Sequence, residues 1–258
     1  MAAAALAWSF LIPLQAQNAR SGNASEKTGP AAQACEQSPR NALWRLAQSC
    51  ARDLQSEPTC RVHAQDQVAE YVIVKDRNTY MKPANYLMIP VRCVTGIEDN
   101  QIFSPAGADL WEEAWLWSRK YPGAPASRTA LAINSAKGRG QDQLHIHISC
   151  VRPEVAGALA GKEIPAYPAK AAALRLQPND YPYYAVKVKG LAGENSPFKV
   201  MLGMLGRGDS HAVKDGDLQD QSIAVIGSEK ANEFYVLVTT AGGENDGHAE
   251  ELLDQTCR

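Results

Sequence analysis

The sequence predicts an α+β fold, an antiparallel sheet with flanking helices, on the basis of two observations. Short β-branched and aromatic segments occur in pairs separated by polar or glycine-containing turns, which is typical of antiparallel hairpins. Segments with apolar residues at helical spacing follow the pairs, in the order strand, strand, helix, strand, strand, helix. With 258 residues, 45% of them hydrophobic, the chain is long enough to bury a stable core.

The folded part of the chain is expected to begin at about residue 41. The polar stretch that precedes it, residues 15–40, has the composition of a disordered linker. An apolar helical pattern then leads into a polar loop between two cysteines, through Leu43, Trp44, Leu46 and Ala47. The chain is therefore divided into residues 1–40, an apolar signal-like segment with its linker, and residues 41–258, the folded domain.

Two strand pairs and a helix are expected next. Residues 71–74 and 86–91 form the first pair around a polar turn. A helix that starts at a capping Asp109 follows, and it stops before a Pro-Gly pair. Residues 129–134 and 143–151 form the second pair around a glycine-rich turn, and a short alanine-rich helix begins at the next proline.

The second half of the chain repeats strand and helix patterns. Residues 183–188 are expected as a strand, and a short helix begins after Ser196. Residues 222–226 and 234–239 then form a hairpin that resembles the first strand pair in its residues. This likeness predicts a decayed duplication, in which only the first half carries the reactive histidines.

The charge balance argues against a nucleic acid as partner. The chain has 26 basic and 28 acidic residues, so it has no strongly positive field to attract a polyanion. The partner must therefore be inferred from a local site.

The six cysteines contain no CxxC pair and no zinc-finger spacing, which leaves disulfides or scattered buried thiols, and disulfides are expected. The apolar run from Ala2 to Leu14 resembles an export signal, which favours an oxidising compartment. Cys50 and Cys60 bracket a short loop and form the expected first bridge. Cys257 would fasten the C-terminal tail to the second strand pair if it were bonded to Cys150.

The most informative segment is the last strand of the second pair. Side chains of a strand alternate between two faces, so Leu144, Ile146 and Ile148 are expected to point into a core. The opposite face then presents a polar row of Gln143, His145, His147 and Ser149. The two imidazoles are about 6 to 7 Å apart along the strand.

This polar row suits chemistry at phosphorus. A neutral imidazole is a good nucleophile, and it can divide one displacement into two through a phosphoramidate. A second imidazole can bind a phosphoryl oxygen or move a proton. Arg139 in the glycine-rich turn can balance phosphate charge, and neutral donors stand nearby at Asn134, Ser135, Gln141 and Gln143.

Two other interpretations of the histidines remain open from the residues alone. A His-x-His pair on a strand can also bind zinc, with a third ligand from a carboxylate or from His63, His211 or His248. The pair can also be two polar surface residues of a half-buried strand.

The segment Gln-x-Gln-Leu-His145-Ile-His147-Ile-Ser resembles the histidine triad signature of nucleotidyl hydrolases and transferases. Asn85-Tyr-Leu-Met-Ile-Pro90 is similar to the His-x-Leu-Val-Ile-Pro strand of that superfamily, and Asp76 precedes it near the place of a ribose-contacting acid. The resemblance implies a histidine-triad-like sheet, with an active half at about residues 41–165 and a degenerate half at about 166–258.

Within that superfamily, residues 43–257 resemble the CDP-diacylglycerol pyrophosphatases most closely, and most densely from Gly138 to Pro153. The resemblance implies hydrolysis of membrane-borne CDP-diacylglycerol to CMP and phosphatidate, at the periplasmic face of the bacterial inner membrane. It implies no cofactor and no metal. The acyl chains require an apolar rim, for which the candidates are the segments 111–117, 155–159 and 181–184.

The resemblance also implies residue roles. The superfamily's nucleophile is the middle histidine of its signature, which maps onto His145, and His147 would contact the phosphoryl oxygens. The first histidine of the signature is replaced by Gln143, which can still donate a hydrogen bond. The remaining expected substrate contacts are Gln141, Asn134, Ser135, Arg139 and Asp76. The alternatives are a non-catalytic nucleotide or nucleotide-lipid binding module, and a hydrolase or transferase acting on another nucleotide.

Overall fold

The computed structural model describes residues 35–65, 70–77, 80–206 and 218–258. Its strands are β1 (Cys60–Gln65), β2 (Glu70–Lys75), β3 (Tyr86–Pro90), β4 (Thr129–Ile133), β5 (Ile146–Val151), β6 (Ala172–Leu176), β7 (Tyr181–Lys189), β8 (Gln221–Gly227), β9 (Glu233–Thr240) and β10 (Leu253–Asp254). Its α-helices are α2 (Ala42–Arg52), α3 (Pro105–Ala108), α4 (Leu110–Ser118), α5 (Pro153–Ala160) and α6 (Pro197–Met204). Short 3₁₀ segments include η1 (Gly96–Glu98), η2 (Asn100–Phe103) and η6 (Ala249–Leu252).

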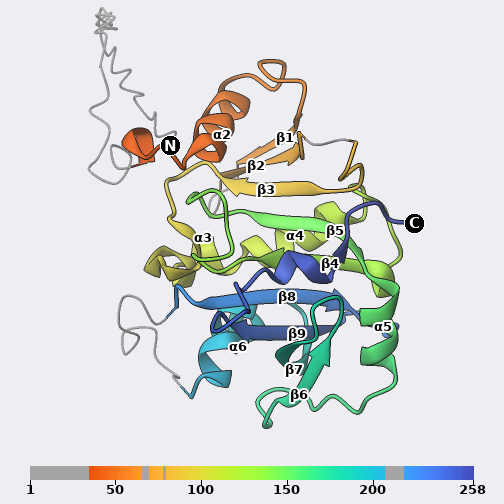
Figure 1. Ribbon diagram of the computed structural model, residues 1–258. Coiled ribbons are helices and arrows are strands. Elements are labelled where there is room, and N and C mark those ends of the chain that lie inside the picture. Colours follow the sequence, from red (N-terminus) through yellow and green to blue (C-terminus); the bar gives the residue numbers. More distant parts are fainter. Residues whose placement is uncertain (1–34, 66–69, 78–79, 207–217) are drawn as a thin grey trace, which may run out of the picture.

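The strands form one antiparallel sheet in the order β1-β2-β3-β5-β4-β8-β9-β7-β6, and β10 pairs with β5 (Figure 1). The three expected strand pairs are present as β2 with β3, β4 with β5, and β8 with β9. The predicted α+β fold, an antiparallel sheet with flanking helices, is therefore confirmed. The histidine strand β5 lies inside the sheet, bonded to β3 on one side and to β4 on the other.

The two halves of the chain share one strand order. The path β2-β3-β5-β4 in the first half matches β6-β7-β9-β8 in the second, and the halves meet where β4 pairs with β8. The last hairpin thus corresponds to β4 with β5, not to the first strand pair that its residues resemble. Alternation of apolar residues is common to all hairpins, so it does not identify which hairpin of one half corresponds to which hairpin of the other. The true counterpart of the first pair is β6 with β7, of which the sequence analysis found only β7.

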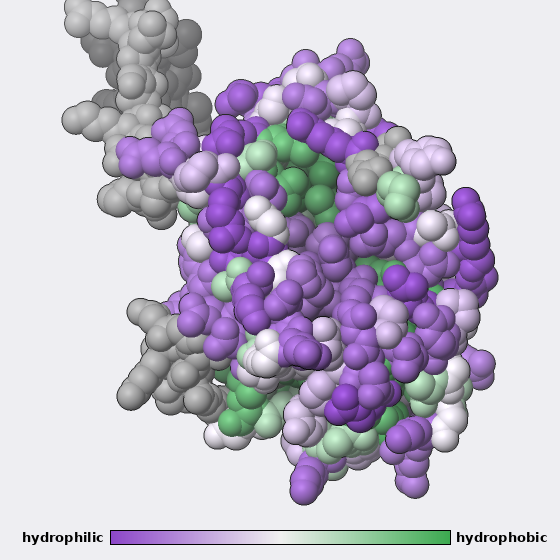
Figure 2. Space-filling model, viewed as in Figure 1, coloured by the Kyte–Doolittle hydropathy of each residue, from purple (hydrophilic) through white to green (hydrophobic). Residues whose placement is uncertain are grey.

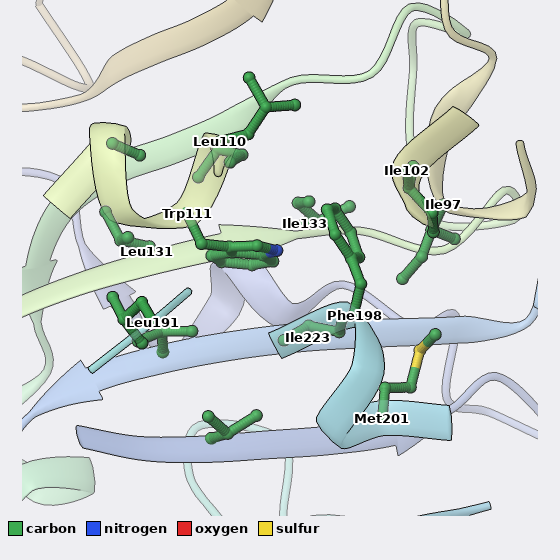
Figure 3. Packing of buried hydrophobic residues seen from close by; sticks show 14 of the residues in the cluster. Ile97, Ile102, Leu110, Trp111, Leu131, Ile133, Leu191, Phe198, Met201 and Ile223 are labelled. Atoms are coloured by element: carbon green, nitrogen blue, oxygen red, sulfur yellow. The ribbon is translucent and has the colours of Figure 1, made fainter. Parts of the chain in front are cut away.

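Helices cover both faces of the sheet. On one face α4 and α6 pack over a large cluster that includes Ile73, Leu131 and Ile223. Figure 3 shows the centre of this cluster, where the Trp111 ring lies beside Phe198 and over the strands. The two rings meet edge to face with centroids 5.5 Å apart, so they join α4 to α6.

The opposite face carries α2, α5 and the C-terminal segment, residues 245–258. On this face, helix α2 packs its apolar side against β2 and β3, where it meets Val72, Val74, Leu87 and Ile89. The middle of the sheet presents small side chains instead, at Ala130, Ala132 and Ala224. These alanines leave room for η6 to lie close to the sheet, and Figure 1 shows the C-terminal segment in dark blue running across β4 and β8.

Three disulfides fasten the fold. Cys50 is bonded to Cys60 and Cys150 to Cys257, which are the two pairs considered from the sequence, and Cys35 is bonded to Cys93. Residues 35–40 were expected to belong to a linker, but Cys35 is buried and covalently held to the fold. The signal-like run from Ala2 to Leu14 lies outside the described residues.

One strand boundary and one helix cap differ from expectation. Strand β5 begins at Ile146 instead of Gln143, because the preceding backbone bonds to loops: Leu144 N–H donates to the Val94 carbonyl. Helix α4 begins after Asp109 as expected, but that side chain makes no capping hydrogen bond.

Among the described helices, none combines the length and the apolar character needed to span a bilayer.

Replacing Trp111 by Ala should lower the free energy of unfolding by about 3–5 kcal/mol, because the ring is fully buried and its removal leaves a cavity between α4 and α6. Denaturant unfolding of the purified protein measures this. Leu116→Ala on the same helix is the matched control, since Leu116 is 53% exposed and its loss should change stability by no more than about 0.5 kcal/mol. Equal effects of the two substitutions would contradict the packing described.

Candidate active site

The predicted histidines line a cavity of about 360 Å³ on the α2 face of the sheet. One wall is apolar and comes from α2, β2 and β3, through Ala42, Leu43, Leu46, Val74 and Leu87. The rest is polar and comes from loops, β5 and the C-terminal segment: Lys75, Asp76, Arg77, Lys82, Asn134, Gly138, Gly140, Gln141, His145, His147, His248 and Glu250. Figure 2 shows a hollow with a hydrophobic floor and a hydrophilic rim beside α2.

His145 is held as a neutral imidazole with one free nitrogen. Its Nδ1 lies 2.7 Å from the Gln143 carbonyl oxygen, which can only accept a hydrogen bond. Nδ1 therefore carries the proton, and Nε2 keeps its lone pair. Burial, followed by the neighbouring His147, lowers the pKa of His145 to about 4. The imidazole is thus neutral at pH 7, and it lines the cavity.

His147 lies two residues on, with its ring centroid 5.0 Å from that of His145. It is paired across the sheet with Leu87 of β3 and Ala132 of β4, which fixes the direction of its side chain. Its Nε2 lies 2.8 Å from Glu250 Oε2, and its Nδ1 lies 3.4 Å from the Asn85 amide nitrogen.

The sequence analysis missed Glu250. This carboxylate comes from the C-terminal segment, more than 100 residues beyond the histidines, and it also lies 3.7 Å from Lys82 Nζ. The charge of His147 holds the pKa of the Glu250 carboxyl well below its usual range, so it is ionised. The expected bond between Cys150 and Cys257 was the available signal, because it places the residues before Cys257 next to the histidine strand.

Five of the predicted site residues line the cavity: Asp76, Asn134, Gln141, His145 and His147. Asp76 accepts a 2.8 Å hydrogen bond from the Asn85 amide, so Asn85 links this acid to His147. The Asn134 side-chain oxygen accepts from the Glu250 backbone N–H. Gln141 Oε1 accepts from the Ala42 N–H and so caps the start of α2.

Gln143 and Ser135 do not line the cavity, although both were expected as substrate contacts. The Gln143 amide donates to the carbonyls of Pro90 and Arg92 at 2.9 Å and accepts from the Val94 N–H. Both of its N–H donors are thereby used to hold the loop after β3. The Ser135 hydroxyl is fully buried and donates to the Asp246 carbonyl of the C-terminal segment.

Arg139 was expected to bind the pyrophosphate, and its side chain does not line the cavity, although its neighbours Gly138 and Gly140 do. Its guanidinium forms a two-pronged ion pair with Glu98, and its side chain is only 5% exposed. A guanidinium paired in this way is neutralised, so the structure does not place its charge where a phosphate would bind. The basic side chains that do line the cavity are Lys75, Arg77 and Lys82.

The other histidines considered as metal ligands lie in different places. His63 lies on β1 and contacts Glu70 at 2.8 Å, whereas His248 lines the cavity together with His145 and His147. His211 lies outside the described residues. Within residues 35–65, 70–77, 80–206 and 218–258, no group of three or more His, Cys, Asp or Glu is arranged to hold a metal ion.

Residues 38–258 match the family model described as CDP-diacylglycerol pyrophosphatase. The chain is 41% identical over 128 residues to the CDP-diacylglycerol pyrophosphatase of Yersinia pestis, covering 46% of this chain and 48% of that one. It is 32% identical over 182 residues to a Mycobacterium leprae (strain TN) protein named "Probable CDP-diacylglycerol pyrophosphatase", covering 68% and 65%. The matched regions thus span about half of the Yersinia pestis protein and about two thirds of the Mycobacterium leprae protein.

A solved structure of yeast Ap4A phosphorylase in complex with AMP is similar with a TM-score of 0.46 and 14% identity, over 77% of this chain and 66% of that one. The family match covers nearly all of the described chain, including both histidines and the C-terminal segment. The chain belongs to the CDP-diacylglycerol pyrophosphatase family.

Proposed function

We propose that this protein hydrolyses the pyrophosphate bond of CDP-diacylglycerol to CMP and phosphatidate, with His145 as the nucleophile. Family membership supports the substrate. The observation that carries the chemistry is the 2.7 Å contact between His145 Nδ1 and the Gln143 carbonyl, which leaves Nε2 with a lone pair at the cavity.

In the first step, the Nε2 lone pair of His145 attacks the cytidylyl phosphorus. The bond from that phosphorus to the bridging oxygen breaks, and its electron pair leaves on phosphatidate. The product on the protein is CMP joined to an imidazolium that still carries its Nδ1 proton. The Gln143 carbonyl oxygen faces that proton and stabilises the positive charge that develops on the ring.

In the second step, water attacks the phosphorus of the intermediate. The phosphorus–nitrogen bond breaks, its electrons return to Nε2, and the proton of the attacking water is released to solvent. CMP leaves and His145 regains its starting protonation state. The two steps together consume one water per CDP-diacylglycerol.

The cavity offers separate surroundings for the parts of the substrate. Lys75, Arg77 and Lys82 supply positive charge for the pyrophosphate. The apolar wall from α2, β2 and β3 suits the flat face of the base. Asp76 lies at the edge of this wall, where it can accept a hydrogen bond from a ribose hydroxyl.

The expected candidates for an apolar rim are mostly buried. Trp111 and Val155 are fully buried, whereas Tyr184 is half exposed on β7 in the second half of the sheet. The loop between β2 and β3 carries two exposed apolar side chains next to the cavity-lining Lys82, with Tyr80 at 92% and Met81 at 63% exposure. We propose that Tyr80 and Met81 face the bilayer in which the substrate lies.

We further propose that the protein works at the periplasmic face of the bacterial inner membrane. The three disulfides support an oxidising compartment. A lipid substrate places the reaction at a membrane surface.

His145→Ala should lower kcat for CDP-diacylglycerol by several orders of magnitude, up to about 10⁶-fold, because no other group replaces a covalent nucleophile. Rapid quenching with substrate labelled in the cytidylyl phosphate should trap acid-labile label on the wild type and none on the variant. His63→Ala is the matched control, since His63 lies outside the cavity against Glu70 and should keep wild-type activity. Retention of a tenth of the wild-type rate by His145→Ala would exclude covalent catalysis there. Tight CMP binding without turnover in the wild type would favour the binding module.

The rate should stay independent of pH from about 7 down to about 5. The pKa of His145 is lowered to about 4, so its lone pair is lost only as the pH falls through that value. An ordinary histidine would be half protonated near pH 6.5. The pH profile of kcat/KM measures this, and an acid limb centred near pH 6.5 would show that burial does not depress the pKa of the nucleophile.

The double substitution Tyr80→Ser, Met81→Ser should weaken activity on CDP-diacylglycerol in vesicles about tenfold, through loss of apolar contact with the bilayer. Its rate on a short-chain analogue below the micelle concentration should be unchanged, because neither residue lines the cavity. Kinetics with the two substrates distinguish the effects. Equal losses on both would place these side chains in the reaction site instead of at the membrane.

A further inference from the structure

The C-terminal segment is fastened to the histidine strand by covalent and hydrogen bonds. Cys257 is bonded to Cys150, which lies three residues after His147 on β5. Strand β10 pairs with the same part of β5, with Asp254 opposite Cys150. The Ser149 hydroxyl donates to the Asp254 carbonyl at 3.0 Å. The segment therefore has a fixed register relative to the histidines.

Close backbone contacts bring the start of the segment to the glycine-rich turn. A Cβ at Gly138 would lie 2.6 Å from the Gly247 carbonyl oxygen, so only glycine permits this approach. Gly247 itself has a positive φ of 71°. The Ser135 N–H donates to the Gly247 carbonyl, and the Asn134 side chain accepts from the Glu250 N–H at 3.1 Å. These contacts place the Glu250 carboxylate at the cavity.

The surroundings of His147 fix where its protons are. The Asn85 amide faces Nδ1 at 3.4 Å, and this amide also donates to Asp76. Glu250 Oε2 faces Nε2 at 2.8 Å. A carboxylate can only accept, so Nε2 carries a proton on the side of Glu250. The other charged or titratable groups around the pair are Lys82, His145, His248 and Asp76.

We propose that Glu250 is a positioning residue for His147, and that the disulfide between Cys150 and Cys257 keeps it in place. Glu250 faces Nε2 of His147 at 2.8 Å and so fixes the position of its proton and the orientation of the imidazole beside the nucleophile. This inference rests on the proposed function, because it assigns the role of Glu250 in that reaction. The C-terminal segment thus completes a site whose histidines come from the first half of the chain.

A fixed His147 serves the reaction in two ways. Its ring centroid lies 5.0 Å from that of His145, and after burial His147 is the next cause that lowers the pKa of His145, which keeps the Nε2 lone pair of His145 available. Its polarised N–H also lies beside the phosphoryl oxygens on which negative charge develops. Without Glu250, the ring would lose the acceptor that holds its proton and its orientation.

The test compares Glu250→Gln with the wild type on CDP-diacylglycerol. Carboxylates that orient a catalytic imidazole contribute on the order of 10²- to 10⁴-fold to rate, and a loss in that range is expected. Glu250→Asp should recover part of the loss. Glu251→Gln is the matched control, because the neighbouring carboxylate points to Tyr183 and Asn179 and does not line the cavity.

Two readouts separate positioning from a structural role. Glu250→Gln should change the shape of the pH profile of the rate as well as its height, which a general loss of folded protein would not do. Nitrogen NMR of the imidazoles should show a changed His147 Nε2 signal in the variant, because the carboxylate that faces this nitrogen is gone. The NMR result does not depend on turnover. If the wild type failed to hydrolyse CDP-diacylglycerol, the proposed function would fail, while the coupling of Glu250 and His147 would still be measured.

The disulfide is tested by a double-mutant cycle. The pair Cys150→Ala, Cys257→Ala should lower activity at a temperature where the protein is still folded, as judged by circular dichroism. If the disulfide acts through Glu250, adding Glu250→Gln to this pair should cause little further loss. Fully additive losses, or an unchanged pH profile and NMR signal in Glu250→Gln, would overturn the inference.

Discussion

The interior position of β5 is the constraint on which the rest of the structure depends. Hydrogen bonds to β3 and β4 fix the strand on both sides, so its side chains cannot change face. Ile146 and Ile148 enter the large core under α4 and α6, and this burial directs His147 to the α2 face. The packing energy of one face therefore orients the reactive group on the other, and the cavity gains a rigid base.

The site gathers charge from several distant segments, and their burial decides which groups can act. Arg139 and Gln143 lie next to the histidines in sequence, yet both are fully engaged by the protein. Lys82 and Glu250 are far from them in sequence and lie at the cavity. Buried polar groups must find partners, so those nearest the core are satisfied internally. Only the polar groups that line the cavity can bind a substrate.

In the part of the chain that the structure describes, the strand order is repeated, and the His-x-His pair occurs in the first half alone. The two halves share a strand order and meet at β4 and β8, so together they bury a continuous core. In the second half, β9 occupies the place of the histidine strand and carries Tyr235 and Leu237 on the corresponding face. That half contributes packing, and its last residues return to the first half to supply Glu250.

The sequence by itself determined the fold class, the hairpins, the faces of the histidine strand and the disulfide between Cys50 and Cys60. These follow from local periodicity and spacing, which a single segment displays without its neighbours. Only the tertiary structure decided that β8 and β9 correspond to β4 and β5, that Arg139 pairs with Glu98, and that Glu250 reaches His147. Each of these depends on contacts between residues far apart in the chain, and alternation of apolar residues within one segment contains no information about its distant partner.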